Sequence, residues 1–115
     1  MATIRSYTTI EQSKALAKIL PLESADMYYF IADSLEKQEI NYAVRCGTPI
    51  VKTDIPCWSL SALLSVLTYP DIKQRYDGNW VCRVENKDTT YLWVDSNPID
   101  ACVAMIEKLH KENIL

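Results

Sequence analysis

The sequence predicts an α+β fold, in which a four-stranded antiparallel sheet carries three helices on one face in the order α-ββ-α-ββ-α. Strand-like segments occur in two pairs, 27–32 with 40–45 and 79–85 with 89–95. Each pair is joined by a short polar linker, which permits a hairpin but is too short for a parallel crossover. Segments with helical apolar spacing flank and separate the pairs. The strand order stays open, because either hairpin can lie at the centre of the sheet.

Signals for the start or end of a helix stand beside each predicted helix. Thr8 opens a capping-box sequence, in which the threonine oxygen accepts an early backbone N–H. Ser59 precedes leucines at helical spacing, and Asn97 precedes a proline, which suits the first helical position. Pro21 and Pro70 are expected to end the first and second helices, because the residue before a proline disfavours helical geometry.

Two connecting regions are predicted to lack helix or strand. A polar turn is expected around 34–38, between the first two strands. The region 46–57 contains one glycine and two prolines and is interpreted as a loop. The alternative that this region contains a further strand around 49–52 is left open.

Length and composition favour one domain over residues 1–115 and exclude several function classes. The net charge of −3 and the interspersed charges argue against a nucleic-acid partner. Only two glycines are present, and neither the P-loop nor the dinucleotide-binding pattern occurs. The N-terminus has no apolar leader and no apolar stretch is long enough to span a membrane, so we expect no membrane partner and a cytoplasmic location.

The chain has four cysteines and one histidine, none in a metal-binding spacing. We therefore expect free thiols, no metal and no cofactor. Cys57 is a weak candidate for a nucleophile or redox thiol, because a following helix N-terminus favours the thiolate. His110 is a weak candidate for its general base. The simpler interpretation is a buried Cys57 and a surface His110 near a helix C-terminus.

Paired carboxylates offer another possible chemistry. Asp95 and Asp100 flank a turn, and Asp54 precedes the second helix. Glycosidase chemistry needs two carboxyl groups at a set separation across a cleft. Helix capping and turn formation account for these residues more simply, so no catalytic role is assigned to them.

Three stretches, 19–29, 54–64 and 95–106, together resemble a group of small uncharacterised proteins from gut Bacteroidetes, many of them encoded by phages or mobile elements. The resemblance covers nearly the whole chain, and Pro56-Cys57-Trp58-Ser59-Leu60 is its most specific part. It implies a bacterial or phage protein. It transfers no catalytic residue, because the group has no established activity.

The hairpin at 79–95 has apolar side chains on both faces, whereas a monomer with helices on one face should have a polar outer face. Another copy of the chain would cover the outer face most simply. A host or phage protein, a small ligand, or loops or the N-terminal segment of the same chain are alternatives. The predicted function is therefore a non-catalytic interaction or accessory module that forms a homodimer. It would bind through an apolar-aromatic sheet face and the Asp54–Ser59 loop.

Within this surface, Trp58 is expected to be a part-exposed anchor, because such tryptophans are frequent binding hot spots. The full set of expected binding residues is Tyr29, Cys57, Trp58, Trp80 and Trp93. The alternative function is a thiol-dependent enzyme or redox sensor centred on Cys57. A nucleic-acid mimic is disfavoured, because it needs a denser run of carboxylates.

Overall fold

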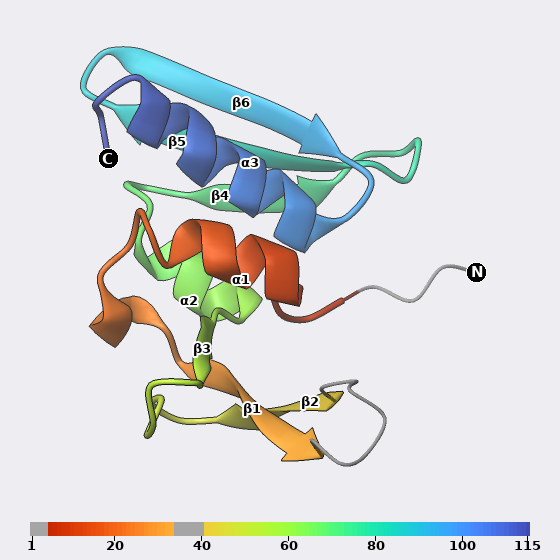
Figure 1. The fold of residues 1–115 in the computed structure, drawn as a ribbon. Coiled ribbons are helices and arrows are strands. Elements are labelled where there is room, and N and C mark those ends of the chain that lie inside the picture. The colour runs from red at the N-terminus through yellow and green to blue at the C-terminus, as the bar shows by residue number, and fades with distance from the viewer. Residues whose placement is uncertain (1–4, 34–40) are drawn as a thin grey trace.

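The computed structural model describes residues 5–33 and 41–115, and it contains two separate three-stranded antiparallel sheets (Figure 1). The α+β class is as predicted, but the single four-stranded sheet is wrong. The two hairpins do not pair with each other. Each recruits a short additional strand, and helices lie between the two sheets (Figure 1).

The first sheet has the order β2-β1-β3. Strands β1 (Met27–Asp33) and β2 (Asn41–Cys46) form the predicted antiparallel pair. Strand β3 (Ile55–Cys57) lies on the other side of β1, within the region predicted to be a loop and displaced from 49–52. A three-residue strand with a central proline has no alternating pattern to reveal it. The turn expected around 34–38 lies outside the described residues.

The second sheet has the order β4-β5-β6. Strands β5 (Trp80–Asn86) and β6 (Thr89–Asp95) form the other predicted hairpin, joined by a two-residue turn with Lys87 at φ 55°. Strand β4 (Asp71–Gln74) pairs with β5 and is absent from the sequence prediction. It is short and mostly exposed, so it lacks the apolar alternation by which strands are recognised.

The three predicted helices are present: α1 (Ile10–Leu16), α2 (Leu60–Ser65) and α3 (Pro98–Lys111). Ser59 and Asn97 cap α2 and α3 as expected. The cap of α1 is Thr9 rather than Thr8, and its capping box uses Gln12. Helices α1 and α2 end several residues before Pro21 and Pro70, and a 3₁₀ turn, η1 (Leu22–Ser24), follows the first proline.

The larger hydrophobic core lies among the three helices and the inner face of the second sheet. Its largest fully buried side chain is Trp58. A smaller cluster of Tyr29, Ile55 and Cys57 lies under the first sheet. In the described residues, no helix combines the length and apolar character that crossing a membrane requires.

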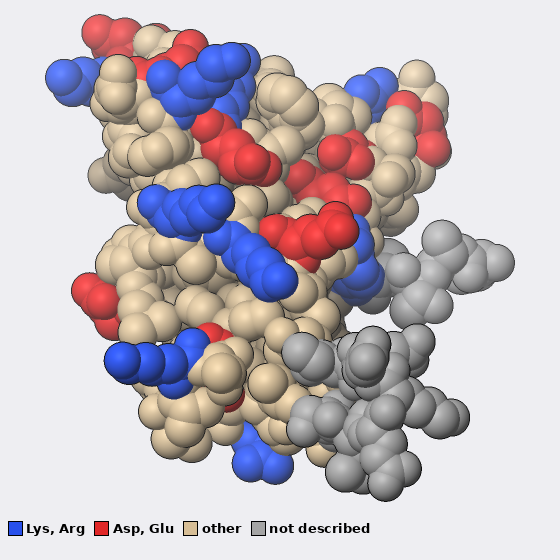
Figure 2. Space-filling model, in the orientation of Figure 1, with Lys and Arg blue, Asp and Glu red and all other residues tan. Residues whose placement is uncertain are grey.

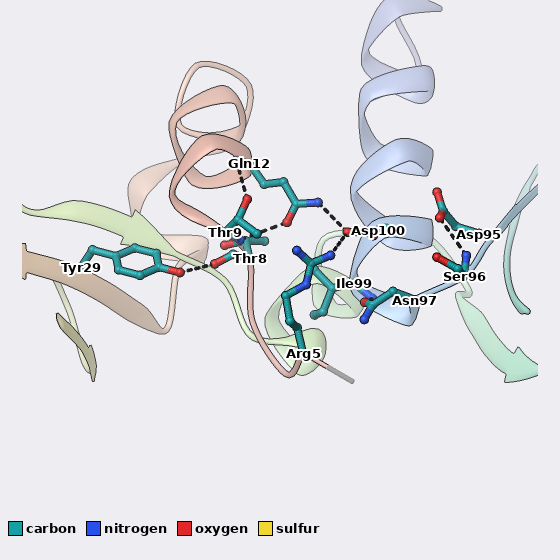
Figure 3. A network of polar contacts seen from close by, with 10 residues as sticks. All are labelled: Arg5, Thr8, Thr9, Gln12, Tyr29, Asp95, Ser96, Asn97, Ile99 and Asp100. Atoms are coloured by element: carbon teal, nitrogen blue, oxygen red, sulfur yellow. Dashed lines mark hydrogen bonds and ion pairs between the residues drawn. The ribbon is translucent and has the colours of Figure 1, made fainter. Parts of the chain in front are cut away.

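Asp100, in the first turn of α3, connects this helix to the N-terminal region (Figure 3). Its Oδ1 accepts a hydrogen bond from Gln12 Nε2 of α1 at 2.7 Å and also binds the guanidinium of Arg5. The carboxylate therefore joins α1 and α3 and favourably occupies the positive end of the α3 dipole. Asp95 instead accepts a hydrogen bond from the backbone N–H of Ser96, in the turn before α3.

Asn97→Ala tests the cap of α3. The Asn97 side chain accepts a hydrogen bond from the backbone N–H of Ile99 at 2.8 Å, and alanine cannot replace it. We expect the free energy of unfolding to fall by about 1 kcal/mol, measured by urea denaturation. Ser61→Ala, at an exposed position of α2, is the control and should change it by less than about 0.5 kcal/mol. Equal effects of the two substitutions would contradict the cap.

Candidate interaction surface

The second sheet has one face against α3 and one face free of helices (Figure 1). On the inner face, Cys82 and Val84 of β5 are buried. Because side chains alternate along a strand, Val81 and its cross-strand partner Val94 lie on the outer face, together with Leu92. Leu92 and Val94 have exposed fractions of 56% and 42%, so the outer face carries an open apolar row.

Strand β6 also lines a groove on the inner side of the sheet. Trp93 of β6 forms one wall of this groove with an exposed fraction of 37%, and the rest is contributed by α3. The Nζ of Lys108 lies 5.9 Å from the centre of the Trp93 ring, a cation–π distance. The groove has a volume of about 410 Å³, and its lining residues are Trp93, Ala104, Glu107, Lys108 and Lys111.

Charged side chains surround the apolar row without giving it a net charge. On the outer face, Asp71 is the cross-strand partner of Arg83, and Lys73 is that of Val81. Arg83 also forms an ion pair with Glu85 on the same strand. Two acidic and two basic residues therefore share this face. Figure 2 shows a similarly mixed distribution of charges over the side that carries α3.

The loop around Trp58 is not the exposed surface that the sequence predicts. Trp58 is fully buried, and its indole Nε1 donates a hydrogen bond to Ser24 Oγ at 3.0 Å. Strand β3 occupies half of the Asp54–Ser59 loop, and no residue of the loop is exposed. The expectation of a part-exposed tryptophan anchor is therefore wrong. Its indole fills the core beside α2 instead.

The other predicted binding residues differ in exposure. Tyr29 is buried, and its hydroxyl donates a hydrogen bond to the carbonyl of Thr8 at 2.6 Å (Figure 3). Burial is the main reason that the pKa of Tyr29 is raised above its usual value. Trp80, at the start of β5, is half-buried. Of the predicted set, only Trp93 is exposed.

Cys57 lies in a closed polar cluster rather than in a cleft. It is fully buried, and its Sγ contacts the hydroxyl oxygen of Thr8 at 3.5 Å. The Thr8 hydroxyl also contacts that of Ser13 at 2.7 Å. Burial is the main reason that the pKa of the Cys57 thiol is raised, which disfavours the nucleophilic thiolate. No hydrogen bond of Cys57 involves His110, which is exposed in the last turn of α3.

The remaining thiols also lack a catalytic arrangement. Cys82 and Cys102 are fully buried, with their sulfur atoms 3.9 Å apart. The hydrogen bond that Cys102 donates to Cys82, followed by burial, raises the pKa of Cys102. Cys46 is exposed on β2. Within the described part of the chain, no three His, Cys, Asp or Glu side chains are grouped closely enough to hold a metal ion.

The sequence prediction missed a second surface groove, on the outer face of the first sheet. Tyr28 and Phe30 of β1 form its floor, and the guanidinium of Arg45 lies 4.8 Å from the centre of the Phe30 ring. Ile50 and Val51 border it and are exposed. The alternation of β1 places these aromatics on one face, but no sequence signal shows that the segment between β2 and β3 borders them.

Comparison of the chain with protein-family models, curated proteins and solved structures finds no match. The resemblance to proteins of gut Bacteroidetes therefore stays a prediction.

Thiol labelling tests the environment of Cys57. We expect native protein at neutral pH to react quickly with iodoacetamide at Cys46 only, because the other three thiols are buried. Mass spectrometry of labelled peptides measures the rate at each site, and Cys46→Ser should abolish the fast phase. Fast labelling of Cys57 in folded protein would contradict the closed cluster and favour the thiol enzyme.

Tyr29→Phe tests the hydrogen bond beneath α1. The substitution keeps the ring but leaves the buried Thr8 carbonyl without its closest donor. We expect the free energy of unfolding to fall by about 1–2 kcal/mol in urea denaturation. Tyr76→Phe is the matched control, since Tyr76 is 99% exposed and should change stability little. If both variants match the native protein, this hydrogen bond adds nothing to stability.

Proposed function

We propose that this protein is a non-catalytic, cytoplasmic interaction module that forms a homodimer through its second sheet. The observation that carries the proposal is the run Leu92-Trp93-Val94 on β6. All three large apolar side chains are exposed, although successive residues of a strand point to opposite faces. On the outer face Leu92 and Val94 form a contiguous apolar row with Val81, and a contiguous exposed apolar surface typically marks an association site.

The charge balance of the outer face supports self-association over a strongly charged partner. The outer face carries equal numbers of acidic and basic residues around its apolar row, so two copies would not repel each other. A symmetric dimer is also the commonest assembly among soluble proteins. The Asp54–Ser59 loop has no part in this proposal, because it is not exposed.

The buried thiols disfavour the alternative of a thiol-dependent enzyme. A cysteine nucleophile requires access, a lowered pKa and usually a neighbouring base. Cys57 is fully buried, its pKa is raised, and its hydrogen-bond partner is Thr8. No described observation favours a reaction at this residue.

Sedimentation equilibrium across the micromolar range tests the proposal. We expect the native protein to have twice the monomer mass and Val94→Lys to have a larger dissociation constant, because lysine replaces an apolar β6 side chain that contacts its neighbours across the association surface. Leu22→Lys is the matched control, since Leu22 is 50% exposed but lies on η1, and it should remain dimeric. A monomeric native protein, or an equal loss of dimer in both variants, would refute the proposal.

A further inference from the structure

In the part of the chain that the structure describes, the two sheets have four edge strands, β2, β3, β4 and β6, and three of these have features that discourage pairing. β3 is three residues long and contains Pro56. β4 has four residues, including Asp71 and Lys73. β2 contains Arg45, and its ladder with β1 has a register shift. Short length, proline, charge and irregularity all protect sheet edges against association.

Strand β6 has none of these protections. It is seven residues long, it pairs with β5 in unbroken register, and it contains no proline or basic residue. Its one charged residue, Asp95, is the last of the strand. Figure 1 shows β6 at the border of the molecule, on the side away from α1 and α2. An edge of this length and composition is suited to pairing with another strand.

The turn geometry identifies the backbone groups that are free at this edge. Asn86 and Thr89 flank the two-residue turn and are cross-strand partners, which makes them a hydrogen-bonded pair. Hydrogen-bonded and non-hydrogen-bonded pairs alternate along an antiparallel ladder. The N–H and C=O groups of Thr90, Leu92 and Val94 therefore point away from β5, toward any strand that joins the edge.

We propose that β6 pairs antiparallel with β6 of a second copy, about a two-fold axis at Leu92, to form a continuous six-stranded sheet. This inference rests on the proposed homodimer and specifies its interface. In this register Leu92 lies opposite the partner's Leu92, and Thr90 lies opposite the partner's Val94. Thr90, Leu92 and Val94 are the residues whose backbone groups are free. In this register each of them therefore lies opposite a residue of the second copy whose backbone groups are also free.

Side chains are complementary in the same register. Tyr91 lies opposite the partner's Trp93 on the inner face, and cross-strand aromatic pairs are favourable. The groove beside Trp93 provides space on the α3 side for the incoming ring. Asp95 lies opposite the partner's Thr89, the uncharged first residue of β6. No two like charges lie opposite each other along β6.

Two substitutions at Leu92 separate edge pairing from packing of the outer faces. Leu92→Pro removes the N–H that would cross the two-fold axis and leaves the hydrogen bonds between β5 and β6 in place, since proline is tolerated at edges. We expect the dissociation constant of the dimer to rise at least about thirtyfold, because two equivalent hydrogen bonds are lost. Leu92→Thr keeps the backbone and a strand-forming side chain, so the rise should be below about fivefold.

Disulfide cross-linking tests which β6 residues of the two copies lie opposite each other. It does not require the Leu92→Pro variant to fold. In a Cys46→Ser background, Leu92→Cys should form a disulfide-linked dimer when diamide accepts the two electrons and two protons from the paired thiols. Val94→Cys is the matched control on the same face, and alone it should not cross-link. Mixed with Thr90→Cys chains, it should form a heterodimeric disulfide.

The outcomes distinguish the edge interface from the homodimer itself. If Leu92→Thr dissociates the dimer while Leu92→Pro does not, or if Val94→Cys cross-links alone as well as Leu92→Cys does, the edge register is overturned and the homodimer stands. If the native protein is monomeric throughout the micromolar range, both proposals fail. Circular dichroism of Leu92→Pro establishes whether it is folded, and the cross-linking result decides if it is not.

Discussion

Pairing of the N-terminal segment with residues 57–60 is the constraint on which the rest of the structure depends. The backbone N–H of Thr8 donates to the Trp58 carbonyl at 3.0 Å, and the Trp58 N–H donates to the Thr8 hydroxyl at 3.1 Å. Tyr7 forms a bridge with Ser59, the cap of α2. These contacts place the starts of α1 and α2 side by side against the first sheet. They leave the opposite side of the helices for α3 and the second sheet.

Local chemistry allowed much of the fold to be predicted, and long-range pairing accounts for the errors. The caps Ser59 and Asn97 and both hairpins follow from residues that are close in sequence. The prediction of a single sheet was wrong because no local pattern indicates that the helices lie between the two hairpins in space and keep them from pairing. Trp58 was misplaced for the same reason, since its burial depends on Ser24 and on helices distant in sequence.

The candidate surface was predicted in part. Apolar residues on both faces of the second hairpin indicated an uncovered face, and Leu92 and Val94 are exposed there. The sequence did not reveal that β6 is an edge, because edge position depends on which strands pair and in what order. Both the exposed outer face of the second sheet and the β6 edge can support association. Only the edge has unpaired backbone N–H and C=O groups, and these fix the register of a strand that pairs with it.

The separation of the hairpins into two sheets also bears on how quickly the chain folds. Every strand pair joins strands that are neighbours in sequence or that have one strand between them: β1 with β2 and β3, and β5 with β4 and β6. The ladders of β1 with β2, β4 with β5 and β5 with β6 therefore close short loops at small entropic cost, and the β1–β3 ladder closes a longer one. A single sheet that contained both hairpins would require strands more distant in sequence to meet before hydrogen bonds between them could form. The observed topology thus favours rapid formation of the three hairpin-like ladders, whereas the pairing of Thr8 with Trp58 joins segments distant in sequence.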